Sequence, residues 1–415
     1  LIEEFGLKDQ LKTGSDFEPL LHIYALEGEK AFERLRGMYA FCLIGGDGRT
    51  WLVRDPFGIK PLYFRRSDER VTFASELRAL RSVPEVGPTA PLAEQLLTLN
   101  YTVGAPGDGD VVFDAARTVI ADVSKVLPGQ VLQLGNGLAR DEHWFDWLPS
   151  WTPRDGDYGS DEQVLRELDA VLEDSVRVHQ RSDVPYGLFL SGGIDSSAVA
   201  TLMARLNERP VTAFTCGFDA SGARDERAHA EAVAKALNLD WRETTFDEED
   251  FWRILPEVAW CLDDPTTDYA TLPTWKLAEA ARGTLTVVLS GEGGDELFAG
   301  YGRYRRALRP SWLGGRPAEP QVNGPFLKRP RAEAGVRSAW RMAHHTNYHL
   351  PRETRLQDAQ AADIATWLPN DLLLKLDRTL MAHGLEGRSP FLDREVAAFA
   401  FNLPDRFKVR GRYGK

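Results

Sequence analysis

The stretch SGGIDSS, residues 191–197, decides the fold, because it separates a short apolar run, residues 186–190, from an apolar-periodic segment, residues 198–206. A short apolar run bounded by turn residues is typical of a buried strand, and apolar residues three or four apart are typical of a helix. The stretch is therefore predicted to be the turn at a strand-to-helix junction. Its two glycines let successive N–H groups form an anion-binding nest, and the helix adds the partial positive charge of its N-terminus.

This turn suits a bound triphosphate. Ser191, Ser196 and Ser197 supply short hydroxyl donors, whereas Asp195 would repel phosphate by itself and is interpreted as a magnesium ligand. A glycine turn capped by serines is the plain alternative, and the full strand–SGGxDS–helix context argues against it. The pattern resembles that of the PP-loop ATP pyrophosphatases, which cleave ATP between its α and β phosphates. The GK[ST] of a Walker loop and the GxGxxG of a dinucleotide site are both missing.

A second glycine-rich stretch, SGEGGDE at residues 290–296, follows the apolar run 285–289. Parallel sheets bind ligands at the carboxyl ends of neighbouring strands, so we expect both stretches to face one crevice. Asp295 could then join Asp195 on magnesium, which takes carboxylate oxygens as ligands. Glu292 would be left as a carboxylate beside the reacting centre. Taken alone the stretch also fits an acidic solvated turn; its pairing with SGGIDSS disfavours that interpretation.

The rest of the chain predicts two kinds of architecture. After residue 161, apolar runs at 186–190, 211–216 and 285–289 alternate with helical segments, which predicts a parallel α/β sheet. Beyond residue 299 the chain is expected to be helical, with a Pro- and Gly-rich surface loop over residues 309–324. Residues 1–147 alternate short apolar runs with turn clusters and are predicted to be β-rich with few helices. Residues 148–160 are mostly polar, with two prolines and two glycines, and are predicted to be a linker.

Composition narrows the class of protein. The 415 residues predict two or three domains. A net charge of −12 disfavours nucleic acid and anionic membrane as partners. No apolar run approaches the ~20 residues of a membrane helix, and the charged first twenty residues do not fit a signal peptide. Three scattered cysteines without a CxxC pair indicate a reducing compartment, so we expect a cytoplasmic protein without a zinc knuckle.

Five motifs together resemble the glutamine-dependent asparagine synthetases of class B, in the right order over essentially the whole chain. They are GMYAF, RDPFGIKPLYF, SGGIDSS, SGEGGDELFAGY and LEGRSPFLD. The resemblance implies a glutamine amidotransferase type 2 domain of the N-terminal-nucleophile β-sandwich type at 1–147, truncated at its N-terminus. It also implies a PP-loop synthetase domain with a helical C-terminal part at 161–415, truncated at its C-terminus. Ammonia is expected to pass between them through an internal tunnel, and a homodimer is one expected assembly.

The activity implied by the resemblance is a carbon–nitrogen ligation. L-Aspartate, L-glutamine and ATP would give L-asparagine, L-glutamate, AMP and pyrophosphate through a β-aspartyl-adenylate, with Mg²⁺. AMP is a far better leaving group than hydroxide, and the ATP site would stabilise the charge that develops in both steps. The partners would all be small molecules: glutamine or ammonia, a carboxylate acceptor and ATP.

The family's functional residues carry over to matching positions. Nucleotide contacts are implied for Phe189, Ser191, Gly192, Gly193, Asp195, Ser196, Cys216, Ser290 and Gly291. Catalytic roles are implied for Glu292 and Lys415, magnesium binding for Asp195 and Asp295, and a contact to the α-ammonium of glutamine for Asp16. Cys216 also fits a packed small hydrophobe.

Two further groups of residues have competing interpretations. Lys375, Asp377 and Arg388 lie in family-like stretches and either line the site or form packed salt bridges. His344, His345 and His349 invite a metal-site interpretation, which the missing carboxylate cluster disfavours.

The resemblance breaks at two points. The family's glutaminase uses an N-terminal cysteine with its own α-amine as base, whereas this sequence begins at Leu1. We therefore expect the sequence to be a fragment, open at both ends, that lacks the nucleophile as it stands. Tyr269 occupies the place where some asparagine synthetases carry an arginine suited to the aspartate carboxylate.

These departures leave other functions open. The same adenylating centre could serve an amidotransferase or cyclising synthetase acting on a natural-product, sugar or β-lactam-precursor carboxylate. A nucleotide-binding scaffold without catalysis is a further hypothesis, against which the intact Asp195, Glu292 and Asp295 argue. A PP-loop enzyme acting on transfer RNA is disfavoured by the charge of −12.

Overall fold

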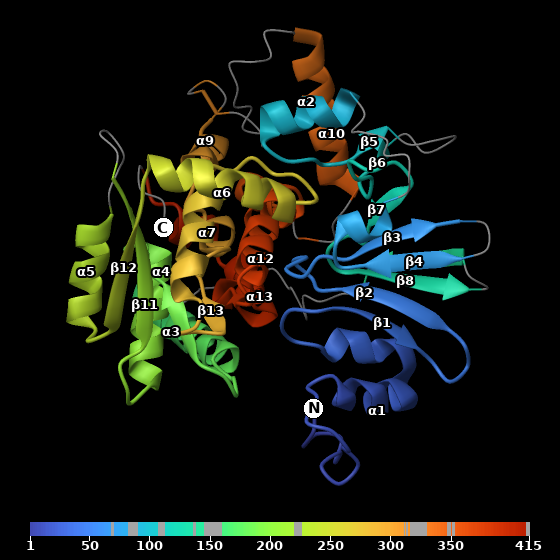
Figure 1. Ribbon diagram of the computed structural model, residues 1–415, viewed down its shortest axis with the longest axis horizontal. Helices are drawn as coiled ribbons and strands as arrows, with labels where there is room; N and C mark the ends of the chain where they lie inside the picture. The colour runs from blue at the N-terminus through green and yellow to red at the C-terminus, as the bar shows by residue number, and fades with distance from the viewer. Residues whose placement is uncertain are drawn as a thin grey trace.

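The computed structural model describes most of the chain as an antiparallel part followed by a parallel α/β part (Figure 1). The residues described are 1–67, 70–81, 90–106, 113–135, 138–144, 160–219, 226–310, 312, 314–315, 330–346, 350 and 353–411. The predicted linker up to residue 159, most of the predicted loop 309–324, His349, the His345 side chain and Lys415 lie outside them.

The antiparallel part contains two main sheets. The four-stranded sheet has the order β1 (Ala40–Ile44), β2 (Thr50–Arg54), β8 (Gln130–Gly135), β9 (Leu138–Trp144). The three-stranded sheet has the order β4 (Val71–Ala74), β3 (Tyr63–Arg66), β7 (Val123–Lys125), and β5 (Ala105–Pro106) pairs with β6 (Phe113–Asp114). The predicted β-rich character of this part is confirmed.

The antiparallel sheets are layered. Trp51 on one face of the four-stranded sheet packs with Ile23 of α1 (Glu18–Glu27) and Phe32 of the 3₁₀ turn Gly28–Arg34. Leu52, one residue along and therefore on the opposite face, packs with Phe64 of β3. The helix and the second sheet thus cover the two faces, which confirms a sandwich-type layered architecture.

The α/β part is built on a five-stranded sheet. Its order is β12 (Asp240–Phe246), β11 (Thr212–Phe218), β10 (Tyr186–Phe189), β13 (Val287–Leu289), β14 (Glu386–Arg388), and all neighbours are parallel. The chain proceeds from β10 outward to β12 and then crosses to β13 on the other side. The strand order therefore reverses between β10 and β13, and such a reversal opens a crevice at the carboxyl ends of the two strands.

Helices cover both faces of this sheet. One core cluster joins β10 and β11 to α3 (Asp161–His179), α4 (Ile194–Leu206) and α5 (Arg227–Ala236). Another joins the sheet to α7 (Thr271–Ala281) and α12 (Leu373–Met381), and α6 (Glu248–Cys261) packs on α7. The helix predicted from Asp161 is confirmed; the Ser160 side chain caps it by accepting a hydrogen bond from the Gln163 N–H.

The described chain after residue 299 is mainly helical, as predicted. Besides α12, its helices are α9 (Gly302–Leu308), α10 (Pro330–Thr346), α11 (Arg355–Ala365), α13 (Arg394–Asn402) and α14 (Asp405–Lys408), with a π-helical turn at Leu368–Leu372; the short α8 (Gly294–Phe298) precedes them. α10 packs against α2 (Ala90–Leu99) of the antiparallel part. None of the helices in the described ranges combines the length and apolarity needed to cross a membrane.

The two parts are joined by a shared core and by ion pairs. Tyr39 and Ile59 of the first part belong to the same buried cluster as Leu172 and Phe391 of the second. Arg36 pairs with the buried Asp393 at 2.7 Å, and its other nitrogen pairs with Asp174 at 2.7 Å.

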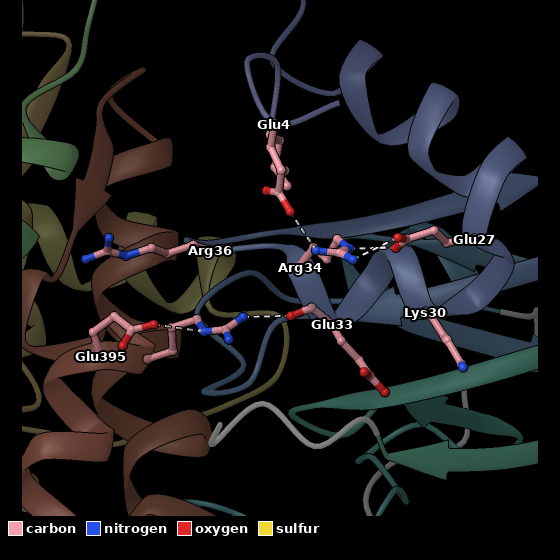
Figure 2. A pocket seen from close by; sticks show the side chains of 9 residues that line it. Glu4, Glu27, Lys30, Glu33, Arg34, Arg36 and Glu395 are labelled. Carbon is pink, nitrogen blue, oxygen red and sulfur yellow. Dashed lines mark hydrogen bonds and ion pairs between the residues drawn. The ribbon is translucent and has the colours of Figure 1, made fainter. Parts of the chain in front are cut away.

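A charged surface pocket lies beside this junction (Figure 2). Figure 2 shows Arg34 between Glu4 and Glu27, which it contacts at 3.0 and 2.6 Å. Arg394 donates to the backbone oxygen of Glu33 at 2.6 Å. Among the described residues that line this pocket, none belongs to the SGGIDSS or SGEGGDE stretch, so it is not the candidate site.

Candidate active site

The two glycine-rich loops meet at the carboxyl ends of β10 and β13. A Cβ atom added to Gly294 would lie 2.6 Å from the Asp195 Cγ, and one added to Gly291 would lie 2.9 Å from the Ser196 N. Side chains at these two positions would therefore push the loops apart. The glycines permit the close approach that places Asp195 against the second loop.

The conformation of the first loop is fixed by hydrogen bonds that its own hydroxyl groups make within the loop. The Ser191 and Ser196 oxygens are 3.0 Å apart, the Gly193 N–H donates to Ser191 Oγ, and Ser196 Oγ donates to the Gly193 carbonyl. Gly192 has φ +76°, in the left-handed region that favours glycine. α4 begins directly after Gly193, so its first N–H groups lie at the loop, where an anion is favoured.

The flanking strands place two more of the predicted nucleotide contacts. Phe189 is the last residue of β10 and packs partly buried against the α7 side of the sheet. Cys216 lies half-buried in β11, with its Sγ 3.5 Å from the Gly217 carbonyl oxygen. Both lie on strands adjacent to the loop, and for Cys216 the packed and the nucleotide-contacting interpretations are compatible.

The second loop is anchored by β14, an element that the sequence did not predict. The Ser290 N–H donates to the Arg388 carbonyl at 2.8 Å, and the buried Ser290 hydroxyl lies 3.2 Å from that of Ser389. Gly293 has φ +91°, and a Cβ there would lie 2.3 Å from a Leu392 methyl carbon. The LEGRSPFLD stretch therefore forms the support on which the SGEGGDE loop rests.

Glu292 and Lys375 form the electrostatic centre of the site. Burial raises the pKa of the Glu292 carboxyl against the opposing effect of Lys375, and the charges of Asp268, Asp295 and Asp195 raise it further. Lys375 is buried and donates to Asp268 Oδ2 at 2.5 Å. Burial by itself would lower the pKa of Lys375, but Glu292 and Asp268 outweigh it, so the pKa is raised and the ammonium stays charged.

The structure answers the question left open for three family-like residues. Lys375 forms a buried ion pair with Asp268, and its charge opposes the rise in the pKa of Glu292. Asp377 instead pairs with Lys60 of the antiparallel part at 3.0 Å. Arg388 pairs with Glu386 at 2.6 Å and donates to the carbonyl oxygens of His179 and Arg181. Asp377 therefore forms an ion pair between the two parts, whereas the partners of Arg388 all belong to the second part; both residues also line a cavity between the two parts.

Asp268 and Asp371 were not predicted as site residues. Asp371 is buried on the π-helical turn and accepts a hydrogen bond from Thr266 Oγ1. Burial, followed by the charge of Asp268, raises the pKa of Asp371 to about 7. The only sign of this site in the sequence was the acidic run DDPTTD at 263–268. That run does not indicate which residues contact it in the fold.

Asp16 lies apart from the two loops. It is exposed and lines a cavity of about 910 Å³ between the two parts, together with Met38 and Tyr39 of the first part and Arg378 and Met381 of the second. Among the described residues that line this cavity, none belongs to the SGGIDSS or SGEGGDE loop.

The carboxylates at the crevice would suit Mg²⁺ only if oxygens of a bound phosphate completed its coordination. Asp195 lies against Gly294, next to Asp295 in the second loop, and the charges of both aspartates raise the pKa of Glu292. Across the described ranges, however, no group of three or more His, Cys, Asp or Glu side chains is arranged to hold a metal ion. Two carboxylates completed by phosphate oxygens and water are the usual environment of Mg²⁺.

Of the three histidines considered for a metal site, His344 is buried beside Trp340, and its Nε2 lies 3.4 Å from Asp358 Oδ1.

The fold and the crevice define a class of protein: a PP-loop synthetase part joined to a glutamine amidotransferase part. The Asparagine synthase family model matches residues 167–415, and the Glutamine amidotransferase domain model matches residues 2–145. The chain belongs to the asparagine synthase family and is a glutamine-dependent ligase of that family.

Named relatives support this membership. Asparagine synthetase [glutamine-hydrolyzing] 1 of Bacillus subtilis (strain 168) is 31% identical over 441 residues, covering 96% of this chain and 67% of the relative. Asparagine synthetase B [glutamine-hydrolyzing] of Escherichia coli (strain K12) is 29% identical, covering 73% of this chain and 50% of the relative. Amidase chyE of Penicillium rubens is 28% identical, covering 80% of this chain and 48% of the relative.

Proposed function

We propose that the protein makes L-asparagine from L-aspartate, ATP and nitrogen supplied by glutamine. The supporting observation is the meeting of the SGGIDSS and SGEGGDE loops, with Glu292 and Lys375 beside them, in a chain of the asparagine synthase family. This arrangement offers donors for phosphate, carboxylates for a metal ion and a fixed cation next to a carboxylate whose pKa is raised.

The first step activates the acceptor. An oxygen of the aspartate β-carboxylate attacks the α-phosphorus, the bond from that phosphorus to the bridging oxygen breaks, and pyrophosphate leaves. The N–H groups of the first loop and the hydroxyls of Ser191 and Ser196 hold the leaving phosphates. Asp195 and Asp295 would hold Mg²⁺, which when bound offsets the charge of the phosphates. Lys415, which lies outside the described residues, keeps the proposed role of stabilising this step.

The second step forms the amide. Ammonia attacks the acyl carbon, the bond to the AMP oxygen breaks, and a proton leaves the nitrogen. Glu292 is the proposed acceptor of that proton, because burial raises its pKa towards the pH at which the reaction runs. Lys375 keeps its charge and stabilises the negative charge that develops at the centre.

Nitrogen supply is proposed to use the cavity between the two parts. Asp16 at its wall would hold the α-ammonium of glutamine, as the family resemblance implies. The domain limits 1–147 and 161–415 are proposed on the same basis, and the two family models match inside them.

One observation favours a second candidate function, in which the acceptor is another carboxylate. Tyr269 stands where some asparagine synthetases carry an arginine. It is 92% exposed, and its side chain offers no positive charge to bind the second carboxylate of an aspartate acceptor. An amidase is among the relatives of this chain. The chemistry of both steps would be the same, and only the acceptor would change.

Transfer of oxygen-18 tests the adenylate route. With L-aspartate labelled in the β-carboxylate and ammonium as nitrogen source, we expect one labelled oxygen per AMP formed, read by mass spectrometry. Label found in inorganic phosphate, with ADP as coproduct, would mean attack on the γ-phosphate and would contradict the proposal.

A further inference from the structure

The segment between α6 and α7, residues 263–268, is buried and is held by both parts of the molecule. Asp263, Asp264, Thr266 and Asp268 are all buried although all are polar. Buried polar groups are expensive unless they are paired, so their partners show what fixes the segment. Some partners come from the antiparallel part and the others from the helices around the candidate active site.

Asp264 is the main anchor to the antiparallel part. Tyr63 on β3 donates its hydroxyl to Asp264 Oδ2 at 3.1 Å, and the buried Lys125 Nζ on β7 lies 3.5 Å from the same oxygen. Burial lowers the pKa of Lys125, an effect that Asp264 opposes. Breaking a buried pair of this kind leaves an uncompensated charge, which is strongly unfavourable.

Three further hydrogen bonds, made by two residues of the antiparallel part, hold the segment. The Asn100 carbonyl accepts hydrogen bonds from the Thr267 N–H at 2.9 Å and from Thr266 Oγ1 at 3.1 Å. Asn100 has φ +75°, a conformation that asparagine tolerates better than most residues. The Arg78 N–H donates to Asp263 Oδ2 at 3.1 Å.

The other side of the segment reaches the active site. Asp268, its last residue, pairs with Lys375 at 2.5 Å, and Lys375 and Glu292 act on each other electrostatically. Thr266 donates to Asp371 on the π-helical turn. Lys125 contacts the same turn directly, because its Nζ donates to Asn370 Oδ1 at 2.8 Å. π-Helical turns are often found at functional sites.

We propose that Tyr63, Asn100 and Lys125 of the antiparallel part are positioning residues for amide formation. They hold the 263–268 segment and thereby place Asp268 on Lys375 beside Glu292. The inference rests on the proposed ligase function but does not involve glutamine. Its consequence is that the ammonium-dependent reaction, which bypasses glutamine hydrolysis, still depends on side chains of the antiparallel part.

Steady-state kinetics with ammonium test this role. Tyr63→Phe removes one hydroxyl and keeps the ring in its cluster, and Lys125→Met removes the buried charge. We expect each to lower kcat for amide formation on the order of tenfold, which is the size of one lost hydrogen bond to a charged group. The KM for ATP should stay the same, because the hydrogen bonds and ion pairs of Tyr63 and Lys125 are made with Asp264 and Asn370 and not with the SGGIDSS loop.

Arg394→Gln is the matched control. Arg394 also connects the two parts, through hydrogen bonds to the carbonyl oxygens of Glu33 and Leu35, but it does not touch the 263–268 segment. We expect this variant to keep the kcat of the unmodified protein. The inference is overturned if Tyr63→Phe and Lys125→Met behave like Arg394→Gln, or if they raise the KM for ATP as much as they lower kcat.

A double-mutant cycle separates failure of this inference from failure of the proposed function. Tyr63→Phe and Lys375→Met change residues that contact opposite ends of the segment, Tyr63 through Asp264 and Lys375 through Asp268. We expect their shifts of the thermal unfolding midpoint to be non-additive, whatever the acceptor is. Additive shifts would overturn the inference even in an active ligase, whereas inactivity towards every carboxylate would contradict the proposed function alone.

Discussion

Glu292 is the proposed proton acceptor in amide formation, and replacing it with an uncharged side chain of the same size tests this role. Glu292→Gln keeps the size of the side chain but cannot accept a proton at the pH of the reaction. We expect amide formation to fall by roughly 10²–10⁴-fold, the usual contribution of a general base, while the dissociation constant for ATP is nearly unchanged.

Equilibrium binding of ATP and a product assay measure the two quantities separately. An equal loss of ATP binding would show that Glu292 holds the loop together and takes no part in the chemistry.

Glu296, four residues further on, provides a pH prediction. Burial raises its pKa from 4.5 to about 8, and Tyr301 donates to Oε1 at 2.7 Å. The folded protein therefore holds a proton between pH 4.5 and 8 that the unfolded chain releases, so the contribution of this residue to stability falls as the pH rises through that window.

Glu296→Gln cannot titrate and retains an oxygen that accepts from Tyr301. We expect its unfolding midpoint to rise relative to that of the unmodified protein between pH 5 and 8, and the difference to level off above about pH 8. Thermal unfolding at several pH values measures this, and two parallel curves would contradict it.

At the scale of elements, the approach of the two loops depends on glycine. In Gly294→Ala the new methyl group would meet Asp195 at 2.6 Å, so one loop must move. We expect pyrophosphate release to fall by at least about tenfold, because a small misplacement of catalytic groups has large effects on rate. Gly335→Ala on α10 is the control: its methyl group meets nothing within 4 Å, so the rate should not change.

If Gly294→Ala released pyrophosphate as fast as Gly335→Ala, the close approach of the two loops would not be needed for the reaction. Both rates can be read from the same pyrophosphate assay.

The elements that the sequence predicted well are those with local signals. The apolar run and the SGGIDSS turn predict β10 and α4, and the rule for parallel strands predicts that Asp195 and Glu292 lie near each other. β14 was missed because Glu386 and Arg388 make it look polar, and only its place beside β13 makes it a strand. The Asp268–Lys375 pair was missed because its members are 107 positions apart. Such a pairing depends on the tertiary fold, which no local pattern records.

At the scale of the whole molecule, one buried core runs through both parts. Tyr39 and Ile59 pack in the same cluster as Leu172 and Phe391, and the 263–268 segment adds the buried Lys125–Asp264 ion pair across the junction. We therefore expect a single cooperative thermal transition in scanning calorimetry, since unfolding of one part would expose the largest buried cluster, which it shares with the other. Two well-separated transitions would contradict the shared core.

We propose above all that this protein activates a carboxylate with ATP and converts it to an amide. We would measure pyrophosphate release from ATP and Mg²⁺ with ammonium as nitrogen source, across a panel of carboxylates led by L-aspartate, and assay asparagine in parallel. We expect release that depends on aspartate, with one asparagine formed per pyrophosphate. Release with another acid alone would keep the chemistry and change the acceptor, and no release with any acid would contradict the claim.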